Sequence, residues 1–196
     1  MISNHFVKDY QFGELTEAIL AILPQRQRES LILTLNNAKI VSKNTLKEKV
    51  EVLKKRIKGV ASKSAVAAAV PIPEVSIAVD IWLIKRETDF YISQLGLPKE
   101  GSNEFSLLNF DTQTKVKALN EALDSAMKIG GLVAAYATES VLEEFTRYTP
   151  FIGIAIASPV SYGATYYFLS EWLGRMEVIA LDVLTQTLQK VRSQKL

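Results

Sequence analysis

Apolar residues recur at steps of three and four along almost the whole chain, which is the spacing of one face of an α-helix. The clearest stripe follows Thr45 and consists of Leu46, Val50, Leu53, Ile57 and Val60. No stretch alternates apolar with polar residues between turn signals, as half-buried strands do, and no internal repeat occurs. The sequence therefore predicts an all-α fold, a multi-helix bundle with long antiparallel helices.

Two short helices are expected first, and they meet at a proline. Pro24 ends the first helix, because proline disfavours helix in its predecessor, and then serves as an early residue of the second. Asn36-Asn37 marks the expected stop of the second helix. The apolar face of the first helix is predicted to consist of Leu15, Ile19, Ile22 and Leu23.

A long helix and its partner are expected next. Thr45 and Glu48 have the spacing of a capping box, which predicts a helix start. Pro71–Pro73 must break that helix, and another is expected from about Glu74 to Leu95, with Gly96 as a left-handed cap. The polar faces of the long helix are predicted to carry Lys47, Lys49, Lys54, Lys55, Arg56 and Lys58.

In the second half of the chain, residues that mark helix boundaries occur at less regular intervals. A short helix is expected around Phe105–Asn109, and Asp111 is predicted to cap the helix after it. Gly130-Gly131 indicates a bend or a close packing point, and a tight apolar turn is expected over Pro150–Pro159. The final helix is predicted from Pro159 to near Val191. The apolar stripe of the capped helix is predicted to consist of Val116, Leu119, Leu123 and Met127.

Composition excludes several classes of function. The 23 basic and 21 acidic residues nearly balance, which gives no argument for a nucleic-acid partner. Cysteine is absent and His5 is the single histidine, so thiolate chemistry and multi-histidine metal sites are excluded. The phosphate-binding motif G-x-x-x-x-G-K-[ST] does not occur. We therefore expect no catalytic, cofactor-binding or metal-binding residues in this chain, which as it stands is not an enzyme.

Two polar features allow both a functional and a structural interpretation. The run Lys47–Lys63 carries seven positive and two negative side chains, which suits an anionic lipid surface or an acidic partner, although a solvated helix face explains it more simply. Asp80 lies in an apolar helix and is either a buried switch or a carboxylate that accepts hydrogen bonds at a helix crossing. The structural interpretation is favoured for both.

The segment Tyr148–Ser170 contains no charged residue and is long enough to span a membrane. It also contains Pro150, Pro159 and several hydroxyl side chains, so a buried helical hairpin explains the same composition. No secretory signal is present at the start of the sequence. A cytoplasmic protein, peripheral on intracellular membranes at most, is expected, with a membrane-inserted helical protein as an alternative.

Several segments resemble the helical domain of immunity-related GTPases, the interferon-inducible family of the p47 type. They occur in the family's order and cover nearly the whole chain. The proline–apolar–proline and threonine–tyrosine–tyrosine segments are the most specific. The four segments are Leu23-Pro24 with Arg28–Asn36, Ala67–Asp80, Phe90-Tyr91 with Gln94–Leu97, and Tyr148–Gly153 with Gly163–Leu169.

The resemblance implies a division of the chain and a function. Residues 1–12 resemble the end of the last strand of the family's GTP-binding domain and the linker after it, whereas residues 13–196 resemble the carboxy-terminal helical domain. Full-length members of the family bind GTP and Mg²⁺, hydrolyse GTP, and act in innate immunity at membranes. The start of this chain resembles that of a truncated member, so the leading hypothesis is a non-catalytic helical scaffold that engages other immunity-related GTPases. The alternative is a fragment of an intact GTPase with no independent role.

A candidate membrane or partner surface follows from the same comparison. In some members an amphipathic helix of the helical domain targets membranes, and the matching segment here is Ala134–Tyr148. Its polar side is acidic, however, whereas a helix that adheres to anionic lipid is expected to be basic. The lysines of the long helix are therefore the stronger half of the candidate surface. The candidate residues are Lys47, Lys54, Lys55, Lys58, Phe145 and Tyr148.

Overall fold

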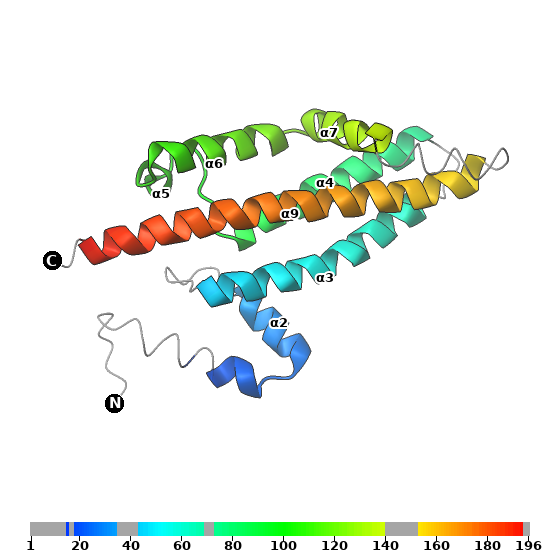
Figure 1. Cartoon of the computed structure of the whole chain (residues 1–196). Helices are drawn as coiled ribbons and strands as arrows, with labels where there is room; N and C mark the ends of the chain where they lie inside the picture. The colour runs from blue at the N-terminus through cyan, green and yellow to red at the C-terminus, as the bar shows by residue number, and fades with distance from the viewer. Residues whose placement is uncertain (1–14, 16–17, 35–42, 69–72, 140–152, 194–196) are drawn as a thin grey trace.

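The computed structural model describes residues 15, 18–34, 43–68, 73–139 and 153–193 (Figure 1). Helices and short connections account for all of these residues, so the predicted all-α bundle is confirmed. Residues 1–12, expected to resemble a strand and linker, lie outside the described part. The helices are α2 (Gln25–Thr34), α3 (Lys43–Ala68), α4 (Pro73–Gln94), α5 (Asn103–Ser106), α6 (Phe110–Leu123), α7 (Ala126–Glu139) and α9 (Gly153–Ser193).

The 41-residue helix α9 is the axis of the bundle. It packs against α3, α4, α6 and α7, and Figure 1 shows it crossing in front of α4, with α3 below and α6 and α7 above. Its inner face buries Phe168, Leu169, Leu173 and Met176 completely, in one core cluster with apolar residues of α3, α4, α6 and α7. Truncation of one such side chain to alanine costs about 2–5 kcal/mol, so this face holds the fold together.

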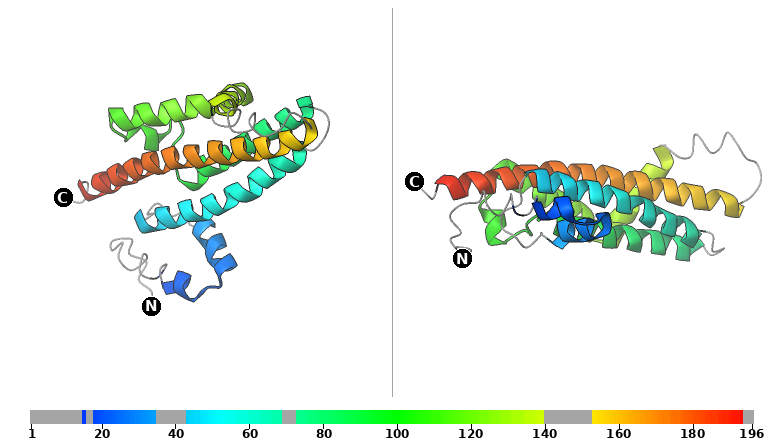
Figure 2. Two further views of the ribbon diagram at one scale, coloured as in Figure 1. Left: turned by 45° about the vertical axis from the view of Figure 1, so that its right-hand side comes forward. Right: turned by 90° about the horizontal axis from the view of Figure 1, so that it is seen from below.

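Helices α3 and α4 form the antiparallel hairpin that the sequence predicts (Figure 2). Three polar contacts join them in turn, from Lys49 with Gln94, through Arg56 with Glu87, to Ser64 with Asp80. As the residue number rises along α3, the number of its partner on α4 falls by nearly the same amount. This order requires the two helices to run in opposite directions.

The end of α4 is closed by the glycine cap that the sequence predicts. Gly96 has a φ of 65°, a left-handed conformation that glycine adopts without a steric penalty. The amide of Leu97 donates to the carbonyl of Ile92 at 3.1 Å, and that of Gly96 donates to the carbonyl of Ser93 at 3.3 Å. These two bonds form a Schellman motif, which satisfies carbonyls that the helix itself leaves unpaired.

The predicted cap of α6 is wrong by two residues. Asn109 is the N-cap, because its side-chain oxygen accepts from the amide of Thr112 at 2.9 Å, whereas Asp111 already lies inside the first turn. The side chain of Gln186 on α9 also holds this helix start. Its amide nitrogen donates to Thr112 Oγ1 at 2.6 Å, and its oxygen accepts from the backbone N–H of Asn109 at 2.8 Å. The short helix α5 ends three residues before the predicted boundary at Asn109.

Two other predicted boundaries also differ from the structure. Helix α3 begins at Lys43, so Thr45 lies within its first turn rather than at a cap. Helix α9 begins at Gly153, so Pro159 lies inside the helix and not at its start. Both differences follow from the same limitation, since a cap motif or a proline marks a helix end only where tertiary contacts do not extend the helix beyond it.

Two predicted apolar stripes are only partly correct. Val116, Leu119 and Leu123 are buried, but Met127 is 85% exposed, because the chain leaves helical geometry at residues 124–125 and α7 starts with a new phase. In the helical turn that includes residues 18–22, Leu20 is buried, whereas Ile19 and Ile22 of the predicted face are exposed, as is Leu15. Leu20 packs in a buried cluster with Ile32 of α2 and Val52 of α3, so the predicted face is not the one that this turn buries.

The glycine pair in α7 is a close packing point and not a bend. Helix α7 runs through Gly130 and Gly131 without interruption. A Cβ atom built on Gly130 would lie 3.0 Å from Cδ1 of Ile81, so the glycine lets α7 approach α4 closely. Of the two interpretations that the sequence left open, close packing is confirmed.

Candidate interaction surface

The four candidate lysines Lys47, Lys54, Lys55 and Lys58 all lie on the exposed side of α3. The opposite side of α3 carries the buried stripe of Leu46, Val50, Leu53, Ile57 and Val60, which the sequence predicted. Because the helical period places all four lysines away from that stripe, the structure brings them to one face of the bundle. Phe145 and Tyr148, the other two candidates, lie outside the described residues.

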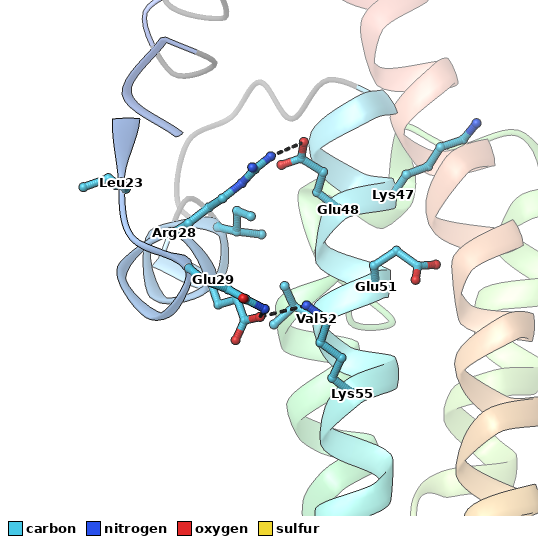
Figure 3. A pocket seen from close by; sticks show the side chains of 10 residues that line it. Leu23, Arg28, Glu29, Lys47, Glu48, Glu51, Val52 and Lys55 are labelled. Atoms are coloured by element: carbon cyan, nitrogen blue, oxygen red, sulfur yellow. Dashed lines mark hydrogen bonds and ion pairs between the residues drawn. The ribbon is translucent and has the colours of Figure 1, made fainter. Parts of the chain in front are cut away.

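Helix α2 packs beside this face and forms a groove with α3 (Figure 3). Ile32 of α2, Val52 of α3 and Leu20 form a small buried cluster beneath it. Two adjoining open hollows, of about 490 Å³ and 520 Å³, occupy the groove and its end. The groove is lined on both sides by charged side chains. Those of α2 are Arg28 and Glu29, and those of α3 are Lys47, Glu48, Glu51 and Lys55.

Ion pairs cross the groove and neutralise part of its charge. Lys55 Nζ lies 2.9 Å from Glu29 Oε1, and Arg28 lies 3.2 Å from Glu48 Oε1, as Figure 3 shows. The hydrogen bond from Lys55 lowers the pKa of Glu29 below its ordinary value. All four side chains are partly or largely exposed, so water screens both pairs strongly. The pairs set the register of α2 on α3 more than they stabilise it.

The basic run is consequently less basic in the fold than in the sequence. Lys54 pairs with Glu51 at 2.8 Å, and the hydrogen bond that Lys54 donates to Glu51 raises the pKa of Lys54. Among the described residues, no acidic side chain forms an ion pair with Lys47, Lys58 or Lys63, all of which are exposed. Of the six exposed cations in the run, the other three, Lys54, Lys55 and Arg56, each form an ion pair with an acidic side chain.

Lys49 does not belong to the surface, although the sequence placed it on a polar face. Its side chain is fully buried between α3 and the end of α4. Its ammonium group donates to the carbonyl of Gln94 at 3.2 Å, at the helix terminus where the macrodipole favours a cation. Burial lowers the pKa of Lys49 from 10.5 to about 8. This lysine is a structural contact between two helices.

Asp80 is a hydrogen-bonded carboxylate at a helix crossing, as the favoured interpretation predicted. Ser64 of α3 donates to Asp80 Oδ1 of α4 at 2.5 Å. The same hydroxyl lies 2.9 Å from Oγ1 of Thr165 on α9. A hydroxyl has a single proton, so with Ser64 donating to Asp80, Thr165 must donate to Ser64. The three groups therefore join three helices at one point.

The third polar contact between α3 and α4 was missed from the sequence. Arg56 forms two hydrogen bonds with Glu87, at 2.7 and 3.0 Å, and its guanidinium lies 4.5 Å from the ring centroid of Phe90. The hydrogen bond with Glu87 raises the pKa of Arg56. Glu87 is buried, so this two-pronged pair is much better shielded than the pairs of the groove. The only signal in the sequence was that the residues three and four positions before and after Glu87, which share its side of the helix, are apolar.

The described part of the chain offers little else as a site. No group of three or more histidine, cysteine or acidic side chains within it could hold a metal ion. Within the same residues, no helix is both long enough and apolar enough to cross a lipid bilayer. The uncharged segment Tyr148–Ser170 is included only from residue 153 onwards.

The fold and this surface define a class: an all-helical module whose buried polar groups join helices and whose exposed charges gather beside one groove. A family model for the interferon-inducible GTPases (IIGP) matches residues 1–190. The chain belongs to this family, which confirms the resemblance found from the sequence. Comparisons with curated proteins and with solved structures gave no match.

Proposed function

We propose that this chain acts as a non-catalytic helical interaction module of the interferon-inducible GTPase family. The observation that carries the proposal is that buried polar side chains form hydrogen bonds between helices. Three of the buried polar side chains, Lys49, Glu87 and Ser64, are each hydrogen-bonded to a group on another helix, and Asp80 is bonded to Ser64. Polar groups that hold the helices of the bundle together are not available for chemistry on a ligand, whereas the candidate lysines on the outer side of α3 are exposed to a partner.

Nucleotide binding tests the non-catalytic part of the proposal. The sequence contains no G-x-x-x-x-G-K-[ST] loop, so its backbone has no cradle of that kind for phosphates. We expect no saturable binding when the purified chain is titrated into fluorescent GTP with Mg²⁺, under conditions in which an unrelated GTPase binds. Saturable binding in the micromolar range would contradict the proposal.

The family match also favours a second possibility, in which the chain works as part of a longer GTP-hydrolysing protein and has no role alone. Sequencing the transcript upstream of the codon for Met1 distinguishes this possibility from the independent module. An open reading frame that continues upstream into a phosphate-binding loop would support the second possibility. An in-frame stop codon directly upstream would support the independent module.

A peripheral contact with anionic lipid is a further candidate, because the exposed cations of α3 share one side of the helix. Lys47 and Lys58 are the strongest contributors, since Lys54 and Lys55 already pair with acidic groups. Each free cation near an anionic membrane contributes about 1 kcal/mol, so binding should be weak and should fall steeply with salt.

Sedimentation with phosphatidylserine vesicles tests this contact. We expect pelleting at low salt that is lost at high salt and in the variant K47E/K58E. The matched control is K117E, which changes an exposed lysine of α6. Pelleting that persists at high salt would exclude an electrostatic contact and would favour insertion of an apolar segment.

A further inference from the structure

Two large apolar side chains are exposed on the outer side of the α3–α4 hairpin. Val66 of α3 is 73% exposed, and Trp82 of α4 is 57% exposed. Val66 follows the buried Ile57 by nine positions, and Trp82 precedes the buried Tyr91 by nine. Nine residues of α-helix make about two and a half turns, so each exposed side chain points away from its buried counterpart.

Both side chains lie on the same side of the bundle. Ile57 and Tyr91 belong to one core cluster with apolar residues of α9. Helices α3 and α4 lie side by side and both pack against α9 (Figure 2). Because each helix turns its buried side toward this core, Val66 and Trp82 both face away from α9.

The register of the hairpin brings the two side chains close together. The hydrogen bond between Ser64 and Asp80 marks residues of α3 and α4 that lie at the same level. Val66 comes two residues after Ser64, and Trp82 comes two residues after Asp80 on a helix that runs in the opposite direction. They are therefore offset by four residues, or about 6 Å along the axis. The axes of packed helices are about 8–10 Å apart, so the two side chains form one patch.

Two exposed cations flank this patch. Lys63 lies three residues before Val66, and Arg86 lies four residues after Trp82, so each cation is about one turn from an apolar side chain. The guanidinium of Arg86 lies 5.3 Å from the ring centroid of Trp82. Among the described residues, neither cation forms an ion pair with an acidic side chain. We call these four residues the hairpin face.

The acidic side chains in this part of the hairpin are already engaged by other residues. Within the described positions 57–68 and 78–87, the acidic residues are Asp80 and Glu87. Asp80 accepts a hydrogen bond from Ser64, and Glu87 is buried and pairs with Arg56. The exposed charge of the hairpin face is therefore positive, which is complementary to an anionic surface.

An anionic lipid bilayer fits this combination better than an acidic protein does. Tryptophan concentrates at the membrane–water interface, and exposed lysine and arginine side chains are attracted to anionic headgroups. A protein partner is ordinarily anchored by large side chains that fill hollows. The two hollows described above are lined by none of the four residues of the hairpin face.

We propose that the hairpin face enters the headgroup region of an anionic membrane. The proposal rests on the lipid contact proposed above, and it names the part of the molecule that touches the membrane. The exposed lysines of α3 attract the chain to the surface, and the hairpin face makes the short-range contact. Val66 and Trp82 lie among the headgroups, while Lys63 and Arg86 bind their anionic groups.

The fluorescence of Trp82 tests the proposal directly. The chain has two tryptophans, and the other, Trp172, is 4% exposed, so iodide in the water quenches mainly Trp82. Subtracting the emission of the variant W82F removes the contribution of Trp172. We expect phosphatidylserine vesicles at low salt to shift the Trp82 emission to shorter wavelength and to protect it from iodide. Vesicles of neutral phosphatidylcholine should do neither, and an equal response to them would contradict the charge argument.

Tryptophans placed at other exposed positions test the orientation on the membrane. In the W82F background, V66W puts a tryptophan on the hairpin face, whereas F110W puts one on α6, where Phe110 is 85% exposed. All three substituted side chains are exposed, so the fold should be kept. V66W should respond to the vesicles as Trp82 does, and F110W should stay accessible to iodide. Equal protection of both would exclude the proposed orientation.

Charge variants measure the contribution of the two cations. The variant K63Q/R86Q should bind phosphatidylserine vesicles more weakly by about fivefold for each charge removed. The matched control K99Q/K117Q also removes two exposed lysine charges, but from the connection after α4 and from α6. A loss of affinity in the control equal to that in K63Q/R86Q would show that net charge alone sets the binding.

The outcomes distinguish this proposal from the lipid contact on which it rests. If the vesicles pellet the chain while Trp82 stays accessible to iodide, the hairpin face is excluded and a contact through other lysines of α3 remains. If the vesicles do not pellet the chain at all, both are excluded, and the nucleotide-binding test of the module is unaffected. Protection of Trp82 by polyglutamate but not by vesicles would assign the face to an acidic protein instead.

Discussion

Replacing Lys49 with methionine should stabilise the protein at neutral pH and not at high pH. Methionine preserves the length of the side chain and removes its charge. The pKa of Lys49 falls from 10.5 to about 8 on folding because the ammonium group is buried. The difference between these two pKa values corresponds to about 3 kcal/mol by which burial disfavours the charged form. Loss of the hydrogen bond to the Gln94 carbonyl offsets about 1 kcal/mol of the gain.

The direction of the pH effect follows from the same values. The unfolded chain holds the Lys49 proton up to a pH of 10.5, whereas the folded chain releases it near 8. Unfolding therefore takes up a proton between these limits, and wild-type stability rises with pH across the window. From pH 7.5 to pH 10 the contribution of Lys49 increases by about 2 kcal/mol. K49M should thus be about 2 kcal/mol more stable than wild type at pH 7.5, and this advantage should disappear by pH 10.

Urea denaturation followed by circular dichroism at several pH values gives the measurement. The variant K47M is the matched control, because Lys47 lies two residues earlier on the same helix and is exposed. Its stability difference from wild type should not change with pH. A difference between K49M and wild type that stayed constant from pH 7.5 to pH 10 would refute the argument that burial, rather than any other property of the site, sets the effect.

Three more substitutions test the packing of the bundle by the same denaturation assay. E87A should cost about 2–3 kcal/mol, since it leaves the half-exposed Arg56 without its buried carboxylate; a cost below 1 kcal/mol would contradict this. G174A should stabilise the fold by about 0.5–1 kcal/mol, because its Cβ atom meets open space, whereas G130A should gain less or lose stability because its Cβ atom would contact a side chain of α4. G96A should cost about 1 kcal/mol at its left-handed φ of 65°, and a stabilising effect would show that the cap relaxes.

The helices and most of the core could be predicted from the sequence because they depend on local periodicity. The stripe of Leu46, Val50 and Leu53 is buried as predicted, and Gly96 caps α4 as predicted. The width of the buried side was not predictable. Lys49 lies next to Val60 and Leu53 on the helical wheel, at the edge of the stripe, and is covered because α4 and α9 both pack on α3, so the buried side is wider than one stripe.

The predictions that failed depended on the helical phase after a break in a helix, or on contacts with a neighbouring helix. The stripe through Leu123 was extended to Met127, but a break of two residues resets the helical phase, which no apolar spacing reveals. The groove between α2 and α3 depends on the angle at which two helices meet, and therefore on contacts such as Lys55 with Glu29. The candidate lysines could be placed on one side of α3 from the sequence, but their ion pairs could not.

The central position of α9 has a consequence for synthesis on the ribosome. Ser64 and Thr165, which meet in the finished bundle, are separated by 101 positions in the chain. Helices α3 and α4 therefore leave the ribosome well before the helix that covers them has been translated. During that interval the apolar sides of a nascent hairpin face solvent, where chaperones bind and where two growing chains can aggregate. We expect the bundle to become protease-resistant only after α9 has emerged, in a single late step.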